Sequence, residues 1–161
     1  MNMPDSLLLF VCTGNICRSP MAEYLLRARL GPDSRWRVAS AGVSAPAGLP
    51  ASEPAVAALR EKGIDLRPHR SRALSRELID DALLIVVMTA AHLAQIRMMN
   101  PGAVEKGFLL KLFDPAAGGR DIEDPLGLSV EGYRLTRDEI DAALPGLAAF
   151  MDSLDITEGR R

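Results

Sequence analysis

Two continuous apolar runs and two shorter ones divide the chain into repeating units. The runs at residues 7–11 and 83–87 are apolar throughout, which is typical of strands buried on both faces of a sheet. Shorter apolar stretches at residues 36–39 and 108–113 predict two more strands. Because helical patterns separate these strands, we predict an α/β fold, with a parallel sheet of four strands and helices on both of its faces.

Helix-end signals fill the segments between the predicted strands. Ser19 and Pro20 suit the N-cap and the first position of a helix that reaches residue 30. Ser52 is a candidate cap for a second helix, which Gly63 should end, and Thr89 is a candidate cap for a third. These signals predict one helix after each of the first three strands.

The last third of the chain combines a long loop with a final helix. Residues 114–127 show little periodicity and are rich in Gly, Pro and Asp, which predicts a loop of a length that is usually functional. Thr136 and Glu139 match a capping box that would open the last helix. Pro145 lies inside that helix and should kink or restart it.

The composition fits one globular domain over residues 1–161. The chain is 48% hydrophobic, enough for a core, and its formal net charge of −2 argues against a nucleic-acid partner. No apolar stretch reaches the length of a membrane span and the first residues lack a basic signal-peptide start, so we expect a cytoplasmic protein without a membrane partner. Its two cysteines should then be thiols, and we expect no metal, no other cofactor and a monomer.

The loop after the first predicted strand carries the candidate chemistry. Cys12 follows the apolar run and Arg18 comes six positions later, with Gly14 and Asn15 between them. Both intervening residue types tolerate positive φ angles and can turn backbone amides inward to bind an anion. The following helix would add its positive end, and Arg18 could donate two hydrogen bonds to a phosphate. The same positive groups favour a thiolate at Cys12, so the loop predicts a nucleophile that faces a phosphate site.

A thiolate that attacks a phosphate ester needs an acid to protonate the leaving oxygen. Asp114 and Asp124, each followed by proline, lie in the loop at residues 114–127. Either could be an ordinary turn residue. Asp124 is the better candidate because it lies just before the final helical region, but spacing alone leaves both open.

These residues resemble a known family, the low-molecular-weight protein tyrosine phosphatases, in their bacterial branch. The similarity lies in residues 12–23 (CTGNICRSPMAE), 40–42 (SAG), 63–72 and the Asp-Pro pair at 124–125, in that order. It spans about residues 7–154, which we take as the core of the domain. It implies a four-stranded parallel sheet with a phosphate-binding loop between the first strand and the first helix.

The resemblance also implies a role for each residue of the site. Cys12 would attack phosphorus while Asp124 protonates the leaving oxygen, and Asp124 would then activate the water that hydrolyses the cysteinyl-phosphate. Arg18 and the loop amides would stabilise the phosphoryl oxygens without a metal. The other implied residues form the phosphate-binding loop, namely Thr13, Gly14, Asn15, Ile16 and Cys17, or support it, namely Ser19, Ser40 and His69.

Cys17 has two interpretations that the sequence leaves open. It could form a disulfide with Cys12 under oxidation, which in the family resembles a protection of the nucleophile against over-oxidation. It could equally be a packed thiol without a redox role.

The main expected activity is hydrolysis of phosphotyrosine on proteins, and the alternative is a protein-arginine phosphatase. Ile16 favours the first, because the arginine-specific branch usually has threonine there and a branched apolar side chain would crowd a planar guanidinium. The Asp-Pro-X-Gly motif at Asp124, Met88-Thr89 and the segment 133–139 are similar to the arginine branch, and no aromatic follows Asp124 to wall a phenyl ring. A thiol-linked arsenate reductase is disfavoured, because it needs further cysteines to relay a disulfide and none follows Cys17. A phosphocysteine carrier is disfavoured as well, because Asp124 and Arg18 would speed the hydrolysis that a carrier should avoid.

Overall fold

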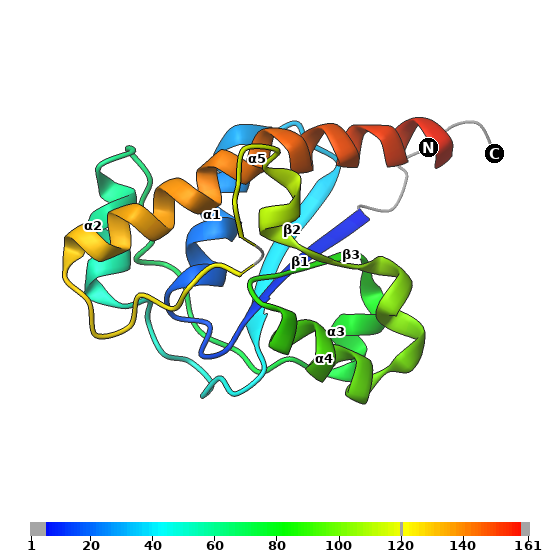
Figure 1. The fold of residues 1–161 in the computed structure, drawn as a ribbon, viewed down its shortest axis with the longest axis horizontal. Helices are drawn as coiled ribbons and strands as arrows, with labels where there is room; N and C mark the ends of the chain where they lie inside the picture. Colours follow the sequence, from blue (N-terminus) through cyan, green and yellow to red (C-terminus); the bar gives the residue numbers. More distant parts are fainter. Residues whose placement is uncertain (1–5, 120, 159–161) are drawn as a thin grey trace.

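A parallel sheet of four strands lies between two layers of helices in the computed structural model, which describes residues 6–119 and 121–158 (Figure 1). The strand order is β2-β1-β3-β4, and each neighbouring pair is parallel. The predicted fold class is therefore confirmed. The strands are β1 (Ser6–Cys12), β2 (Trp36–Gly42), β3 (Ala82–Val87) and β4 (Gly107–Leu109).

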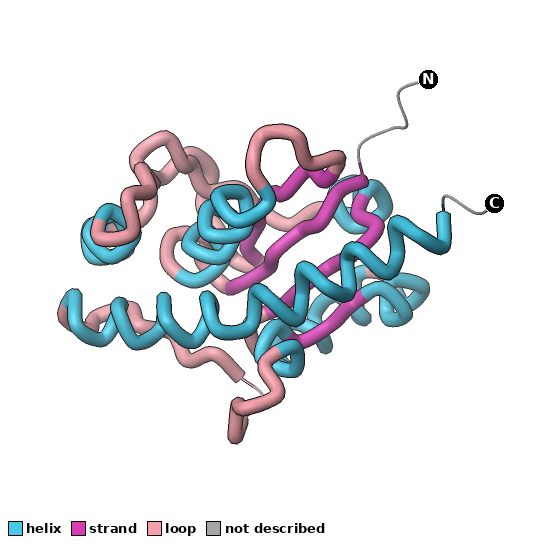
Figure 2. The backbone as a smooth tube through the Cα atoms, turned by 90° about the horizontal axis from the view of Figure 1, so that it is seen from above, coloured by secondary structure: helices cyan, strands magenta, loops and turns pink. Residues whose placement is uncertain are grey.

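Each face of the sheet has its own hydrophobic core. One face is covered by α1 (Arg18–Leu30), α2 (Glu53–Arg60) and the long α5 (Val130–Glu158), and the other by α3 (Arg76–Asp81) and α4 (Ala90–Met99) (Figures 1 and 2). Among the described residues, no helix is both long enough and apolar enough to cross a membrane.

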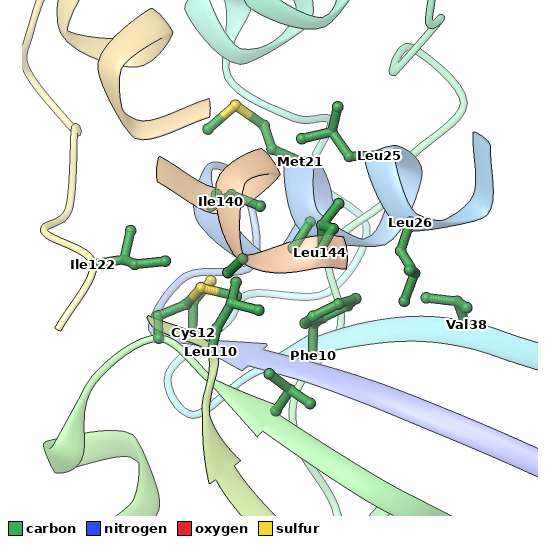
Figure 3. Close-up of a cluster of buried hydrophobic side chains, with 14 of the residues drawn as sticks. Phe10, Cys12, Met21, Leu25, Leu26, Val38, Leu110, Ile122, Ile140 and Leu144 are labelled. Atoms are coloured by element: carbon green, nitrogen blue, oxygen red, sulfur yellow. The ribbon is translucent and has the colours of Figure 1, made fainter. Parts of the chain in front are cut away.

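Strand β1 lies at the centre of the sheet and feeds both cores. Leu8, Phe10 and Cys12 face the core under α1 and α5, whereas the residues between them face the core under α3 and α4. Both sets are buried, because a central parallel strand has no solvent face. Cys12 is the last residue of the row under α1, and Figure 3 shows it near Ile122, beyond Phe10. The pleat of the strand thus decides on which side of the sheet the thiol lies.

Of the caps predicted at Ser19, Ser52 and Thr89, the first is misplaced, the second lacks a capping hydrogen bond and the third is confirmed. Helix α1 begins at Arg18 with Cys17 as its N-cap, so the prediction of Ser19 as the cap is wrong, and Ser19 lies in the first turn. Ser52 precedes α2 as predicted, but its hydroxyl donates to Tyr133 instead of capping the helix. Thr89 is confirmed as the cap of α4, where it forms a capping box with His92.

The end of the chain also departs from the expected elements. The fourth strand covers only residues 107–109, and a 3-10 helix replaces the rest of the predicted run. The capping box at Thr136 is wrong, because α5 already begins at Val130 and the Thr136 hydroxyl donates to the carbonyl of Gly132. Helix α5 also continues through Pro145 without a restart. The reason is tertiary: a stripe of buried side chains runs along the helix from Tyr133 to Met151 and packs on the sheet and α1.

Candidate active site

The loop between β1 and α1 turns around the thiol of Cys12. Asn15 has φ 56°, the only positive φ among the described non-glycine residues, and its backbone N–H donates to the sulfur of Cys12 over 3.3 Å. Gly14, which the sequence also suggested for a positive φ, does not have one. The left-handed turn at Asn15 therefore directs an amide at the thiol and leads the chain into α1.

A buried hydrogen-bond network fixes this turn from behind. The Asn15 side-chain amide donates to Ser19 Oγ and to Ser40 Oγ, each over 2.9 Å, and its oxygen accepts from the Arg72 backbone N–H. Since Ser19 Oγ accepts from Asn15, its own proton is available to the Cys12 sulfur at 2.8 Å. An O–H that donates to sulfur stabilises the thiolate more than the thiol.

The outer part of the network contains His69 and Glu23. The carbonyl of Asn15 can only accept, so the His69 Nε2–H donates to it, over 2.7 Å. Burial lowers the pKa of His69, which keeps the ring neutral near pH 7. The Ser40 hydroxyl donates to the buried Glu23 carboxylate over 2.6 Å. The three predicted supporting residues, Ser19, Ser40 and His69, thus all form hydrogen bonds with Asn15 of the loop.

The end of β2 passes so close to the loop that only glycine fits there. A Cβ on Gly42 would lie 3.0 Å from the backbone nitrogen of Asn15, 2.8 Å from Cβ of Ala45, and closer still to the carbonyl oxygen of Thr13. Real Cβ atoms do not approach that closely, so the loop would have to move. In the sequence, Gly42 stood out only as part of the segment 40–42 that resembles the family, and nothing there indicated this contact.

We expect Gly42→Ala to lower kcat/KM for an aryl phosphate by at least about tenfold, because displaced loop amides no longer match the phosphoryl group. Overpacking should also cost about 1–3 kcal/mol of stability. Steady-state kinetics and thermal unfolding measure the two effects. Gly118→Ala is the matched control, since a Cβ there meets no atom within 4 Å. Unchanged kinetics in Gly42→Ala would show that the close approach does not hold the loop.

Arg18 and Asp124 meet beside the loop. Arg18 is 4% exposed; its Nη1 donates to the Ile122 carbonyl over 2.9 Å and its Nη2 lies 3.6 Å from Asp124 Oδ2. Asp114, the other candidate acid, instead accepts from the backbone N–H of Ala116 in a local turn. The structure thus brings Asp124, and not Asp114, to the loop between β1 and α1.

A cavity of about 100 Å³ lies between these groups. It is lined by residues 12–18 together with Asp124 and Leu126. The larger hollows of the surface lie elsewhere; one of about 640 Å³ runs along the outer edge of β2, away from the cysteine. The small cavity at the loop combines a thiol, a guanidinium and a carboxylate.

The thiol of Cys17 contacts α5 and the residue that precedes α2. Its sulfur is 3.2 Å from the Tyr133 hydroxyl and 3.4 Å from the Ser52 hydroxyl, and both cysteines are free and buried. Burial raises the pKa of Cys17, and burial also raises the pKa of Tyr133 to about 12. The sequence did not predict that Tyr133 on α5 closes over the loop, because the contact depends on how a distant helix packs.

Comparison with known proteins places this geometry in a family. The family model described as "Low molecular weight phosphotyrosine protein phosphatase" matches residues 7–156. The chain belongs to this family. It is therefore a cysteine-dependent phosphatase, and the predicted membership is confirmed.

Among relatives of this phosphatase, a protein-arginine-phosphatase of Geobacillus stearothermophilus is 45% identical, over 88% of this chain and 93% of the relative. A probable low molecular weight protein-tyrosine-phosphatase, EpsP, of Ralstonia solanacearum is 41% identical, over 73% of this chain and 77% of the relative. The solved structure of the YwlE arginine phosphatase from Geobacillus stearothermophilus has a TM-score of 0.84 and 42% identity, and the match covers 94% of this chain and 96% of that one.

Proposed function

We propose that this phosphatase hydrolyses phosphotyrosine on proteins through a cysteinyl-phosphate on Cys12. The observation that carries the proposal is the environment of the sulfur, which accepts a hydrogen bond from the Asn15 backbone N–H and lies 2.8 Å from the Ser19 hydroxyl at the start of α1. Such an environment suits a thiolate nucleophile at an anion site. Arg18 lines the same cavity, where its planar guanidinium could donate to phosphoryl oxygens.

The reaction would take two steps with Asp124 as the acid and then the base. In the first step a Cys12 S–P bond forms and the P–O ester bond breaks, while Asp124 gives its proton to the leaving phenolate oxygen. In the second step Asp124 takes a proton from water, whose oxygen attacks phosphorus. The S–P bond then breaks, inorganic phosphate leaves and the thiolate is restored. Arg18 and the loop amides would stabilise the equatorial oxygens in both steps.

The side walls of the cavity support an aromatic ester as the substrate. Beyond the loop's polar groups, the cavity is lined by the side chains of Ile16, which is half-buried, and Leu126, which is 61% exposed. Aliphatic walls pack against the faces of a phenyl ring and stabilise it by burial of apolar area. They offer no hydrogen-bond partner to a guanidinium, which would depend on the Asp124 carboxylate and the polar groups of the loop for its N–H groups.

A protein-arginine phosphatase is the second candidate function. Its support is the 45% identity to a relative of that name and the 0.84 TM-score to a solved arginine phosphatase. Both candidates use a phosphorylated protein as substrate and the same loop chemistry. The cytoplasmic location and the monomeric state stay predictions from the sequence.

Ile16 decides between these substrates in our proposal. The wild-type enzyme is expected to prefer a phosphotyrosine peptide over a phosphoarginine peptide of the same sequence. Ile16→Thr should gain phosphoarginine activity by about tenfold or more, since a hydroxyl in the wall can accept from the guanidinium. Release of phosphate from both peptides measures this. Equal phosphoarginine activity in the two enzymes would exclude Ile16 as the determinant, and a wild-type preference for phosphoarginine would favour the second candidate.

A further inference from the structure

A buried histidine from another helix contacts the phosphate-binding loop. His92 lies in the first turn of α4, on the opposite face of the sheet from α1, and is only 4% exposed. Its Nε2 is 2.9 Å from the hydroxyl oxygen of Thr13, which is an exposed residue of the loop and lines the cavity. Helix α4 follows β3, which ends beside β1, so the sheet brings the two residues together (Figure 1).

The helix cap fixes which nitrogen of His92 carries the proton. The backbone N–H of Thr89 points at Nδ1 over 3.2 Å, and a backbone N–H can only donate. Nδ1 must therefore accept, so in the neutral ring the proton is on Nε2 and is donated to Thr13. Burial and, after it, the positive charge of Arg18 lower the pKa of His92 to about 4, which keeps the ring neutral near pH 7.

The hydroxyl of Thr13 then has a defined direction. Its oxygen accepts from His92 Nε2 and also from Arg18 Nη2 at 3.4 Å. A hydroxyl has two acceptor positions and one proton. With both acceptor positions in use, the remaining O–H is available to an acceptor in the cavity beside Arg18.

We propose that the Thr13 hydroxyl is a phosphate-binding donor and that His92 is its positioning residue, held in the required tautomer by the cap of α4. The proposal rests on the proposed function in one respect, namely that the cavity at Cys12 takes a phosphoryl group. It adds a side-chain donor to the backbone amides and the guanidinium. It also gives His92, which forms the capping box of α4 with Thr89, a role in ligand binding.

The test measures binding of inorganic phosphate by calorimetry, so that it does not depend on turnover. Thr13→Val should weaken phosphate binding by about tenfold, as expected for the loss of one hydrogen bond to a charged group, and Thr13→Ser should stay within about twofold of wild type. His92→Leu should weaken binding in the same direction. His92→Gln should restore part of the affinity, since glutamine at this position can complete a capping box and its amide can donate.

A double-mutant cycle separates positioning from a merely structural role. If His92 acts through Thr13, His92→Leu has no further effect on phosphate affinity in the Thr13→Val background. Equal losses in both backgrounds, or wild-type affinity in Thr13→Val, would overturn the proposal. Thermal unfolding of each variant separates lost binding from lost folding. If the variants behave as expected but phosphotyrosine peptides are not hydrolysed, the proposed function fails and this inference stands.

Discussion

Cys12→Ser is expected to lower kcat for an aryl phosphate by at least about 10⁴-fold. Losses of this size are typical when an enzyme loses a nucleophile that acts together with other catalytic groups. A serine hydroxyl stays protonated at neutral pH, and the neighbouring Ser19 donates a hydrogen bond and cannot act as a base. The variant should still bind inorganic phosphate, because Arg18 and the loop amides are unchanged. Single-turnover kinetics and phosphate binding measure the two properties.

Cys17→Ser is the matched control for this substitution. It removes the other cysteine of the same loop, whose sulfur contacts the hydroxyls of Tyr133 and Ser52. A serine hydroxyl can form hydrogen bonds with the same two groups and so partly replaces the thiol. We expect kcat within about threefold of wild type and a stability loss of about 1 kcal/mol. A similar loss of turnover in both variants would mean that loop packing, and not the Cys12 nucleophile, explains the first result.

Asp124→Asn should lower kcat for phosphotyrosine peptides by about 100-fold to 1,000-fold, since the amide cannot give a proton to the leaving oxygen. The loss should be much smaller for a nitrophenyl phosphate, whose leaving oxygen needs less protonation. Comparison of the two substrates in steady state therefore tests the role of the acid directly. An equal loss for both leaving groups would contradict that role.

Asp114→Asn is the control for the acid. Asp114 shares the following proline and the turn geometry with Asp124, because both carboxylates accept from the backbone N–H two residues later. Only Asp124 lies near Arg18. We expect Asp114→Asn to leave kcat unchanged for both substrates. A lower kcat in this variant would mean that Asp114, and not Asp124 alone, takes part in the proton transfer.

The conformation of the loop between β1 and α1 is stabilised mainly by residues outside the loop. Asn15 adopts its left-handed turn because Ser40 from β2, His69 from the following loop and the Arg72 backbone all bond to it. Gly42 allows β2 to approach closely enough for these bonds to form. Each of these groups is far from Cys12 in sequence, so substitutions remote from the thiol should affect activity through the position of Asn15.

The sequence by itself determined the fold class, the central strands and the position of the loop between β1 and α1. It could do so because two apolar runs must be buried on both faces, and because a cysteine, a glycine, an asparagine and an arginine at that spacing serve a local structure. It misplaced the caps at Ser19 and Thr136, whose hydroxyls instead bond to Cys12 and to the Gly132 carbonyl. Spacing alone left the acid open between Asp114 and Asp124, and the resemblance to the family implied Asp124.

Tertiary structure decided what depends on contacts between distant segments. It brought Asp124 to Arg18, Tyr133 to Cys17 and His92 to Thr13, and it let α5 pass through Pro145 because a long apolar stripe packs there. These outcomes depend on the pairing of β1 with β3 and on where α5 crosses the sheet, and neither local propensity nor spacing along the chain contains that information. The residues of the loop between β1 and α1 are therefore adjacent in the sequence, whereas the position of Asp124, the contacts that support Asn15 and the tautomer of His92 depend on the whole fold.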